Sequence, residues 1–321
     1  RVPSRGTPPV SLRRRKTSCP SAWKQARSIG AEPSGIIKIM TNEEYTKSIN
    51  KWRQEVDDNL RRENGWLALA GLFWLRKGTN DIGSAPNSDI LLPSRAPAKL
   101  GTFVFDGDSV ILNVELDTPV EVNGVPTKIG RLDTDEEDVP SFITFTDMRM
   151  VVVRRSKGVG IRLWDNTRAE RRTFPHREWF PIKEEFRIPA IYTRYDSPRI
   201  VKMPDILGAI VDQRMEGFVT FELNGKKHEL VVEELPDRRL FVQFMDSTNG
   251  NPTYPSGRYH YTDAHQDGNV FVDFNKAYSP PCAFTDYATC TFPPQENHLK
   301  VAIEAGEIYT GQHWFSGLIK K

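Results

Sequence analysis

Polar side chains that could do chemistry gather among aromatic residues and prolines in the C-terminal part of the chain. Asp246, Arg258 and Asp273 lie at the ends of strand-like runs, and Asn275 follows closely after Asp273. Strand ends could bring the two carboxylates and the guanidinium to one edge of a sheet. Such a cluster perturbs pKa values, and groups with perturbed pKa values concentrate at functional sites. We therefore place the candidate site here.

The full set of candidates divides into two groups. The predicted catalytic residues are Asp246, Arg258, Asp273, Asn275, Tyr278 and Cys282. The predicted ligand-binding residues are Arg162, Asp165, Trp179, Cys290 and Asn297.

Three chemistries fit these residue types. In a hydrolase, Asp273 or Asp246 would act as the base, while Arg258 and Asn275 hold an anionic or carbonyl oxygen. In a thiol enzyme, Cys282 would be the nucleophile, and the candidate bases are His260, His265 and His298.

The third chemistry is a zinc site built from Cys282, Cys290 and one or two of the same histidines. The two cysteines lack the C-x₂-C spacing of most structural zinc sites, so we assign no metal and no cofactor. A structural interpretation competes with all three chemistries. In it the polar group is a buried network that fixes an irregular loop, whose prolines cannot donate hydrogen bonds.

The preceding chain supplies the elements that would position these residues. Thr41 and Glu44 form a capping-box pattern, and apolar residues then recur at spacings of three and four, which predicts an amphipathic helix over 41–64. Short strand-like runs separated by turn residues follow over 65–165. This pattern is typical of a β-sandwich.

The sandwich region resembles a forkhead-associated (FHA) domain through residues 71–93, "GLFWLRKGTNDIGSAPNSDILLP", and 120–126, "VEVNGVP". The resemblance implies a phosphothreonine site with an Arg directly after the turn glycine, but Ser84 follows Gly83 here. Ser94 and Arg95 lack the histidine that follows them in the FHA pattern. We expect an FHA-like sandwich that does not bind phosphopeptides.

A second β-rich unit is predicted over 186–310, after a connector rich in Arg and aromatic residues at 166–185. The connector could face an anion or form a seam between domains. The clearest strands of the second unit are Gly217–Leu223 and His228–Glu233, joined by the hairpin turn Asn224-Gly225. The predicted fold is mainly β: the sandwich, then an antiparallel barrel or curved sheet, with one N-terminal helix.

The run 243–306 resembles the DUF1684 family, a group of proteins of unassigned function. Its matching pieces include Asp273-Phe274-Asn275, Pro280-Pro281-Cys282, Pro293-Pro294 and Glu296-Asn297. Upstream pieces, "GIRLWDN" and "FPHREWFPI", extend the resemblance to about residues 45–310. We call residues 273–306 the signature segment. The family supplies no reaction.

Charge is unevenly distributed along the chain. Residues 1–39 hold nine Lys or Arg and one acid, whereas 40–321 hold 35 basic and 41 acidic residues. An acidic body argues against binding nucleic acid, which requires a positive face. The leader 1–40 is expected to be a disordered tail or a transit-like segment, and 311–321 a tail. No apolar run is long enough to span a membrane, so we expect a cytoplasmic protein, or a mitochondrial or plastid one if the leader targets it.

The sequence thus predicts a protein that binds, and could hydrolyse, a small polar or anionic ligand at the C-terminal β unit. The alternative is a non-catalytic adaptor that uses the FHA-like sandwich as a protein-binding surface.

Overall fold

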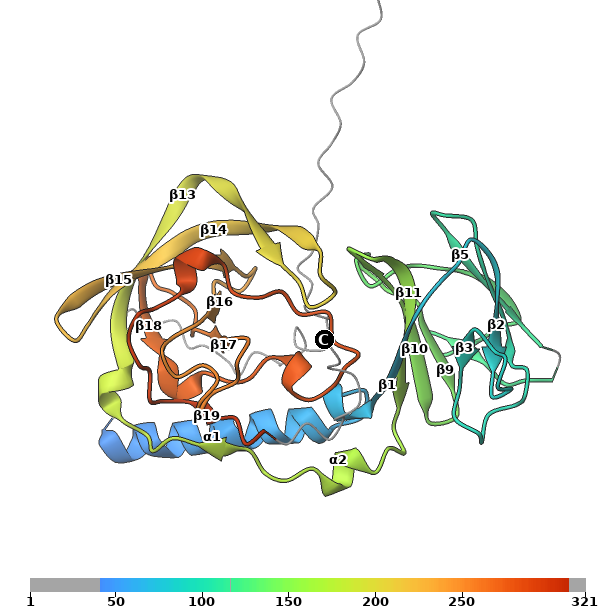
Figure 1. Cartoon of the computed structure of the whole chain (residues 1–321), viewed down its shortest axis with the longest axis horizontal. Coiled ribbons are helices and arrows are strands. Elements are labelled where there is room, and N and C mark those ends of the chain that lie inside the picture. Colours follow the sequence, from blue (N-terminus) through green and yellow to red (C-terminus); the bar gives the residue numbers. More distant parts are fainter. Residues whose placement is uncertain (1–40, 116, 312–321) are drawn as a thin grey trace, which may run out of the picture.

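A computed structural model describes residues 41–115 and 117–311. The chain is mainly β, and Figure 1 shows two β-rich parts side by side, with helix α1 (Asn42–Arg61) lying along the C-terminal part. No helix within the described ranges is long and apolar enough to cross a bilayer. The predicted leader lies outside the described residues, as does all of the predicted tail except Gly311.

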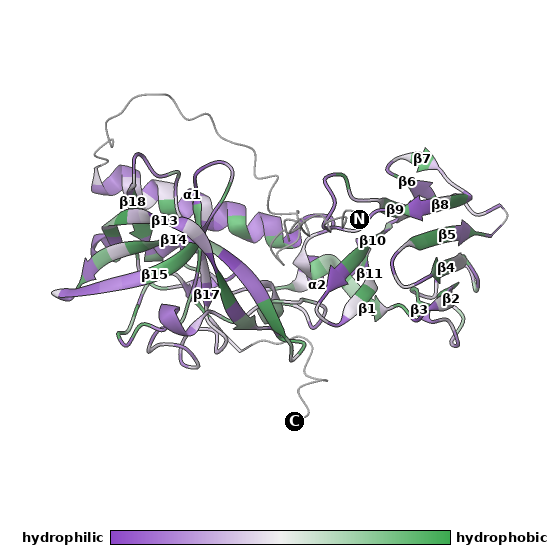
Figure 2. Ribbon diagram, turned by 90° about the horizontal axis from the view of Figure 1, so that it is seen from above, coloured by the Kyte–Doolittle hydropathy of each residue, from purple (hydrophilic) through white to green (hydrophobic). Residues whose placement is uncertain are grey.

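Helix α1 begins at the predicted capping box. The Thr41 side chain accepts a hydrogen bond from the Glu44 amide, and the Glu44 carboxylate accepts one from the Thr41 amide. The helix carries hydrophilic and hydrophobic bands (Figure 2), and its apolar face buries Tyr45, Ile49 and Leu60. Burial of this stripe, rather than intrinsic propensity, supplies most of a helix's stability in a folded protein.

The N-terminal part is a β-sandwich of two sheets. One sheet has the order β1 (Leu69–Trp74), β11 (Gly158–Asp165), β10 (Met148–Arg155), β9 (Phe142–Phe145), β6 (Glu121–Val122) and β7 (Val125–Pro126). The other has the order β3 (Ile90–Leu91), β2 (Gly78–Gly83), β4 (Gly101–Phe105), β5 (Val110–Val114) and β8 (Ile129–Leu132). Buried residues of both sheets, such as Phe103 and Ile161, form one core between them.

The C-terminal part is built on a curved antiparallel sheet. Its order is β17 (Arg258–Tyr261), β16 (Leu240–Phe244), β15 (Lys226–Glu234), β14 (Ile210–Leu223), β13 (Arg187–Pro204) and β18 (Asn269–Asp273). Strands β17 and β18 stand at opposite ends of this order, so the sheet does not close into a barrel. The predicted turn joins β14 to β15, with Asn224 and Gly225 both at positive φ, as a type I′ hairpin requires.

The signature segment packs on the inner face of this sheet. Its short elements are η4 (Phe274–Lys276), η5 (Pro281–Ala283) and η6 (Gln295–Asn297), and just beyond them β19 (Glu307–Ile308) pairs with β12 (Glu178–Trp179) of the connector. Phe274 and Ile303 join Val219 and Leu230 of the sheet in one apolar core. The remaining short helices are η2 (Trp66–Ala68), α2 (Glu170–Thr173) and η3 (Glu184–Phe186).

The same segment also joins the two parts of the molecule. Cys282 and Phe284 share an apolar cluster with Trp66 and Leu69 from the start of the sandwich, and with Trp164 of β11. Burying apolar side chains from both parts in one cluster favours their unfolding together.

Candidate functional site

Asp246 and Arg258 form a fully buried ion pair. Arg258 Nη2 lies 2.6 Å from Asp246 Oδ2, and neither side chain is exposed. Arg258 also donates to the carbonyls of Ala305 and Ile303, while Asp246 accepts from the amides of Ile303 and Thr248. The two predicted partners do meet, and their hydrogen bonds hold the end of the signature segment.

Asp273 and Asn275 belong to a second cluster, which ties the C-terminal sheet to helix α1. Tyr45 of α1 donates a hydrogen bond of 2.9 Å to Asp273, and the Asn275 amide bonds to Tyr45, to Asp273 and to both backbone groups of Lys183. Burial raises the pKa of Asp273. It also raises the pKa of Tyr45, with the Asp273 charge adding to that effect.

Asn297 completes a sheet edge. Strands β15 and β16 pair only at the end where Glu233 and Glu234 lie. Beyond that point the Asn297 amide accepts from the Val231 N–H and donates to the carbonyls of Val231 and Gln243. The side chain therefore takes the place of a strand backbone and fixes η6 beside β15.

Tyr278 and Trp179 lie in an aromatic group between α1 and the sheet. Trp52 of α1 makes an edge contact with Trp179, at a centroid distance of 5.6 Å, and a tilted contact with Tyr278 at 6.3 Å. The guanidinium of Arg53 lies 5.0 Å from the centre of the Trp179 ring. These contacts pack the connector onto α1.

Arg162 and the two cysteines lie at the seam between the two parts. Cys282 and Cys290 are buried, and burial raises the pKa of the Cys290 thiol well above its ordinary value. A raised pKa lowers the thiolate fraction that nucleophilic or metal-binding chemistry needs. Arg162 is fully buried and donates to the Thr289 hydroxyl at 3.3 Å.

Asp165 lies at the end of β11. It accepts two hydrogen bonds from Arg95, of 3.0 and 2.5 Å, and two more from Thr167. Ser84, at the position where the FHA pattern has an arginine, donates to the Ala96 carbonyl. Ser84 and Arg95, the two turn residues compared with the FHA pattern, thus both make contacts within the sandwich.

The three histidines considered as bases make separate contacts. His260 is buried and accepts a hydrogen bond from the Asp273 amide, His265 lies 3.1 Å from Glu234, and His298 lies 3.4 Å from the Pro293 carbonyl. Burial lowers the pKa of His260 to about 3, so this ring is neutral at pH 7. Within residues 41–115 and 117–311 no group of three or more His, Cys, Asp or Glu side chains could hold a metal.

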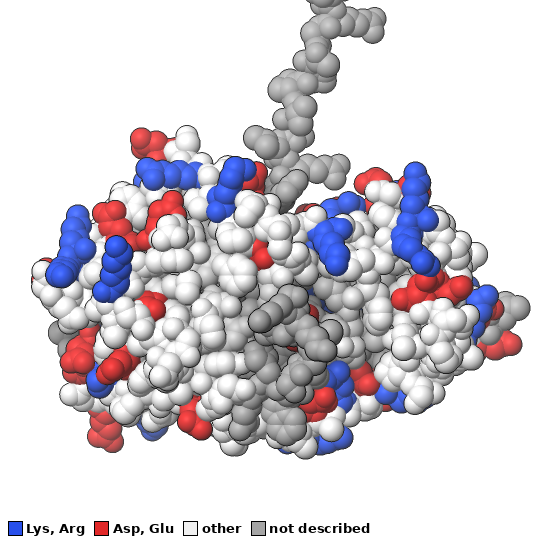
Figure 3. Space-filling model, viewed as in Figure 1, with Lys and Arg blue, Asp and Glu red and all other residues white. Residues whose placement is uncertain are grey.

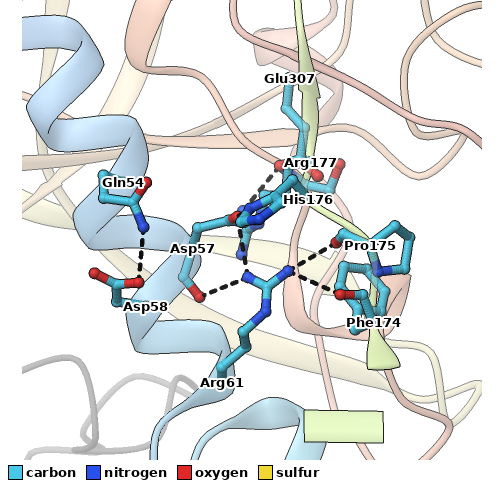
Figure 4. A network of polar contacts seen from close by, with 10 residues as sticks. Gln54, Asp57, Asp58, Arg61, Phe174, Pro175, His176, Arg177 and Glu307 are labelled. Atoms are coloured by element: carbon cyan, nitrogen blue, oxygen red, sulfur yellow. Dashed lines mark hydrogen bonds and ion pairs between the residues drawn. The ribbon is translucent and has the colours of Figure 1, made fainter. Parts of the chain in front are cut away.

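A charge network that the sequence did not suggest, largely buried except at His176, joins α1 to the connector and β19 (Figure 4). Asp57 lies 3.0 Å from Arg61, 2.7 Å from His176 and 3.5 Å from Arg177. Arg177 also pairs with Glu307 at 3.0 Å, and both of these side chains are buried. Burial raises the pKa of Glu307. The network fixes the connector against the helix.

An open hollow of about 330 Å³ lies on the outer face of the C-terminal sheet. It is lined by Tyr195, Arg199, Phe218, Glu229, Val231 and Glu296. Phe218 and Val231 face each other across β14 and β15, and the β13 register shifts between Arg194 and Arg199. Tyr195 lies within that irregularity and Arg199 at its end.

Sequence reasoning missed this hollow. Glu296 lies in the signature segment, and its neighbour Asn297 docks η6 onto β15, but the other lining residues carry no motif. The available signal was Phe218 on the solvent-facing side of β14, where an alternating strand normally carries polar residues. The pairing of Phe218 with Val231 could not be predicted, because it depends on the register between β14 and β15.

Charged residues of both signs are interspersed on the face of the molecule that Figure 3 shows.

The fold and the contacts of the candidate residues define a mainly β protein of two joined parts. The C-terminal sheet of this protein is covered on one face by a loop core rich in buried polar contacts. The comparisons with known proteins place it in a family.

The model of the family described as "Protein of unknown function (DUF1684)" matches residues 172–308. An uncharacterized protein of Haloarcula marismortui, solved by NMR, is 31% identical, with 45% of this chain and 82% of that chain covered and a TM-score of 0.38. The chain belongs to the DUF1684 family, as the signature segment predicts.

FHA-domain structures also match. The FhaA FHA domain complexed with the intracellular domain of Rv3910 is 19% identical, covers 28% of this chain and 85% of that chain, and has a TM-score of 0.19. The Rv0020c FHA structure is 20% identical, with 28% and 76% covered and a TM-score of 0.20. No curated protein matches the chain.

Proposed function

We propose that the C-terminal β unit binds a small polar molecule in the hollow on the outer face of β13, β14 and β15. The observation that carries the proposal is the hollow itself. Its volume of about 330 Å³ lies within the range of small-ligand sites, roughly 300–1,000 Å³. Aromatic surface from Tyr195 and Phe218 lies there beside charged side chains, a combination typical of such sites.

The framework of the hollow supports this role. Its walls are the neighbouring strands β13, β14 and β15 of one sheet and the short helix η6. The Asn297 amide fixes η6 through two hydrogen bonds to β15 and one to β16. A site on elements held in this way needs little ordering when a ligand binds, which lowers the entropic cost of binding.

The proposed activity is binding alone. Asp246 and Asp273, which the sequence favours as bases, are buried in protein contacts and do not line this hollow. A base must reach the water or hydroxyl whose proton it takes.

Ligand-observed NMR with a set of small polar molecules of mixed charge tests the proposal. The matched variant is Val231→Trp, which fills the hollow while the backbone groups of residue 231 can still bond to Asn297. We expect molecules that bind the wild-type protein and lose their signal with Val231→Trp. Circular dichroism checks that this variant is folded.

A second variant guards against a folding defect in the first. Phe218→Ala removes aromatic surface from the hollow and is expected to weaken the same molecules. If no molecule shows binding that depends on Val231 or Phe218, the proposal is wrong.

A further inference from the structure

The charges around the outer hollow are unbalanced. Glu229 and Glu296 are exposed, and neither has a hydrogen-bond or ion-pair partner among the residues that the structure describes. Arg199 is the single cation of the lining, so the six residues together carry one net negative charge. Most acidic residues at the end of β15 are paired instead. Glu234, for example, contacts Arg194 and His265.

In the aromatic part of the hollow, a cation of the protein itself already covers one of the two rings. The guanidinium of Arg199 lies 4.0 Å from the centre of the Tyr195 ring. Tyr195 and Phe218 are 5.5 Å apart between ring centres, with planes tilted by 36°. Arg199 is therefore held against Tyr195, and Phe218 offers the aromatic surface that a ligand could contact.

Both carboxylates act on the Tyr195 hydroxyl. The pKa of Tyr195 is raised, first by burial, and the charges of Glu229 and Glu296 add to the effect while Arg199 opposes it. The two carboxylates come from different elements, β15 and η6, yet both raise the pKa of the same hydroxyl.

We propose that the ligand of this hollow is a small organic ammonium ion with an apolar body. This inference rests on the proposed function. Two unpaired carboxylates attract a cation, and an aromatic ring and Val231 offer surface to its apolar part. An anion would meet two carboxylates, and the one guanidinium is stacked on Tyr195. A metal ion is a poorer fit, since aromatic rings do not ligate it and two exposed carboxylates supply few oxygens.

The test compares three probes of similar shape: 2-phenylethylammonium, neutral 2-phenylethanol and anionic phenylacetate. Their binding to the full chain is measured by calorimetry or NMR titration at low salt. We expect the ammonium probe to bind at least about fivefold more tightly than either of the others, the scale of one or two exposed charge contacts.

Isosteric variants locate the effect. Glu229→Gln and Glu296→Gln should each weaken the ammonium probe about two- to fivefold, which is the value of an exposed ion pair. Glu121→Gln, on the sandwich, changes the net charge equally and should leave the affinity unchanged. Arg199→Gln removes the opposing charge and should leave the affinity unchanged or raise it.

The outcomes separate this inference from the proposed function. If 2-phenylethanol or phenylacetate binds as tightly as the ammonium probe, and Val231→Trp abolishes that binding, the ammonium assignment is wrong while the binding site stands. The same holds if other molecules bind there but the ammonium probe does not. If no molecule of any charge binds in a Val231-dependent way, the proposed function fails and this inference fails with it.

Discussion

Neutralising Asp246 should strongly destabilise the protein, because its partner Arg258 would remain charged and buried. Neither side chain of this pair is exposed. Breaking a buried ion pair by removing one partner costs about 3–5 kcal/mol, since the remaining charge is uncompensated. Asp246→Asn keeps the shape of the side chain and removes only the charge. For a chain of this size the loss corresponds to a fall in Tm on the order of 10 °C.

The measurement is urea or thermal unfolding followed by circular dichroism, with Asp212→Asn as the matched control. Asp212 pairs with Lys202 at 3.1 Å, but these side chains are 52% and 76% exposed. Breaking an exposed pair of this kind costs at most about 1 kcal/mol. The control has the same chemical change, but its ion pair is exposed where that of Asp246 is buried.

A double variant, Asp246→Asn with Arg258→Met, completes the cycle. Removing both charges leaves no unpaired ion, so the double variant should be more stable than the sum of the two single losses predicts, by about 0.5–3 kcal/mol. If Asp246→Asn unfolds within about 1 kcal/mol of the wild-type protein, the pair does not hold the fold as argued. A role for Asp246 in chemistry would then regain support.

Three further predictions follow from other buried or turn contacts. The pKa of His260 falls from 6.5 to about 3 in the fold, so the stabilising contribution of its neutral ring is fully present above pH 6.5. Below that pH the unfolding free energy should drop by about 1.4 kcal/mol per pH unit. When the unfolding free energy is measured by urea unfolding from pH 7 to 5, it should fall less steeply with pH in His260→Gln than in the wild-type protein. An equally steep fall in both proteins would contradict the prediction. Asn297→Ala leaves three backbone groups of β15 and β16 without their hydrogen-bond partner, and it should lower the unfolding free energy by roughly 2–4 kcal/mol. A loss under about 0.5 kcal/mol would instead show that water replaces the amide. The pKa of Asp106 is lowered to about 2, chiefly by hydrogen bonds from the Ser109 and Asp108 amides, so its contribution to stability holds above pH 3.8 and is lost as the pH falls through about 2. A carboxyl NMR titration that gives an ordinary pKa for Asp106 would refute this.

Local sequence signals predicted the elements whose causes are local. The capping box at Thr41 and the turn at Asn224-Gly225 each depend on residues within a few positions, and both occur in the structure. In such places propensity, periodicity and turn chemistry agree.

Strand β13 was not predicted, although it spans Arg187–Pro204 and makes the most extensive pairing of the C-terminal sheet. It contains Pro189, Pro198 and Pro204, and prolines argue against a strand because they cannot donate to a ladder. Its register shift lies between Arg194 and Arg199, around Pro198. Pro198 lies in this irregular stretch, whereas Pro189 and Pro204 occupy positions in the regular register of the strand.

The candidate site was predictable only in part. Asp246 and Arg258 meet as strand-end reasoning suggests, because they follow and begin adjacent strands of one sheet. Asp273 instead bonds to Tyr45, which lies 228 positions away in a helix whose docking no local pattern specifies. The outer hollow depends on a strand irregularity and a docked loop, so it too was beyond sequence reasoning.

The polar residues of the signature segment and its surroundings have a shared physical task, which explains why the family signature does not reveal a ligand. A loop that forms part of a core has no neighbouring strand for its N–H and C=O groups, and buried backbone groups must find partners. Arg258 supplies donors to the Ala305 and Ile303 carbonyls, and Asn297 bonds to the backbone of β15 and β16. Residues that satisfy these backbone groups are buried and already hydrogen-bonded, so their identity is explained by the conformation of the loop and does not indicate a ligand. A ligand is better sought where the segment presents an unengaged charge to solvent, and Glu296, fixed in place by Asn297, is such a charge.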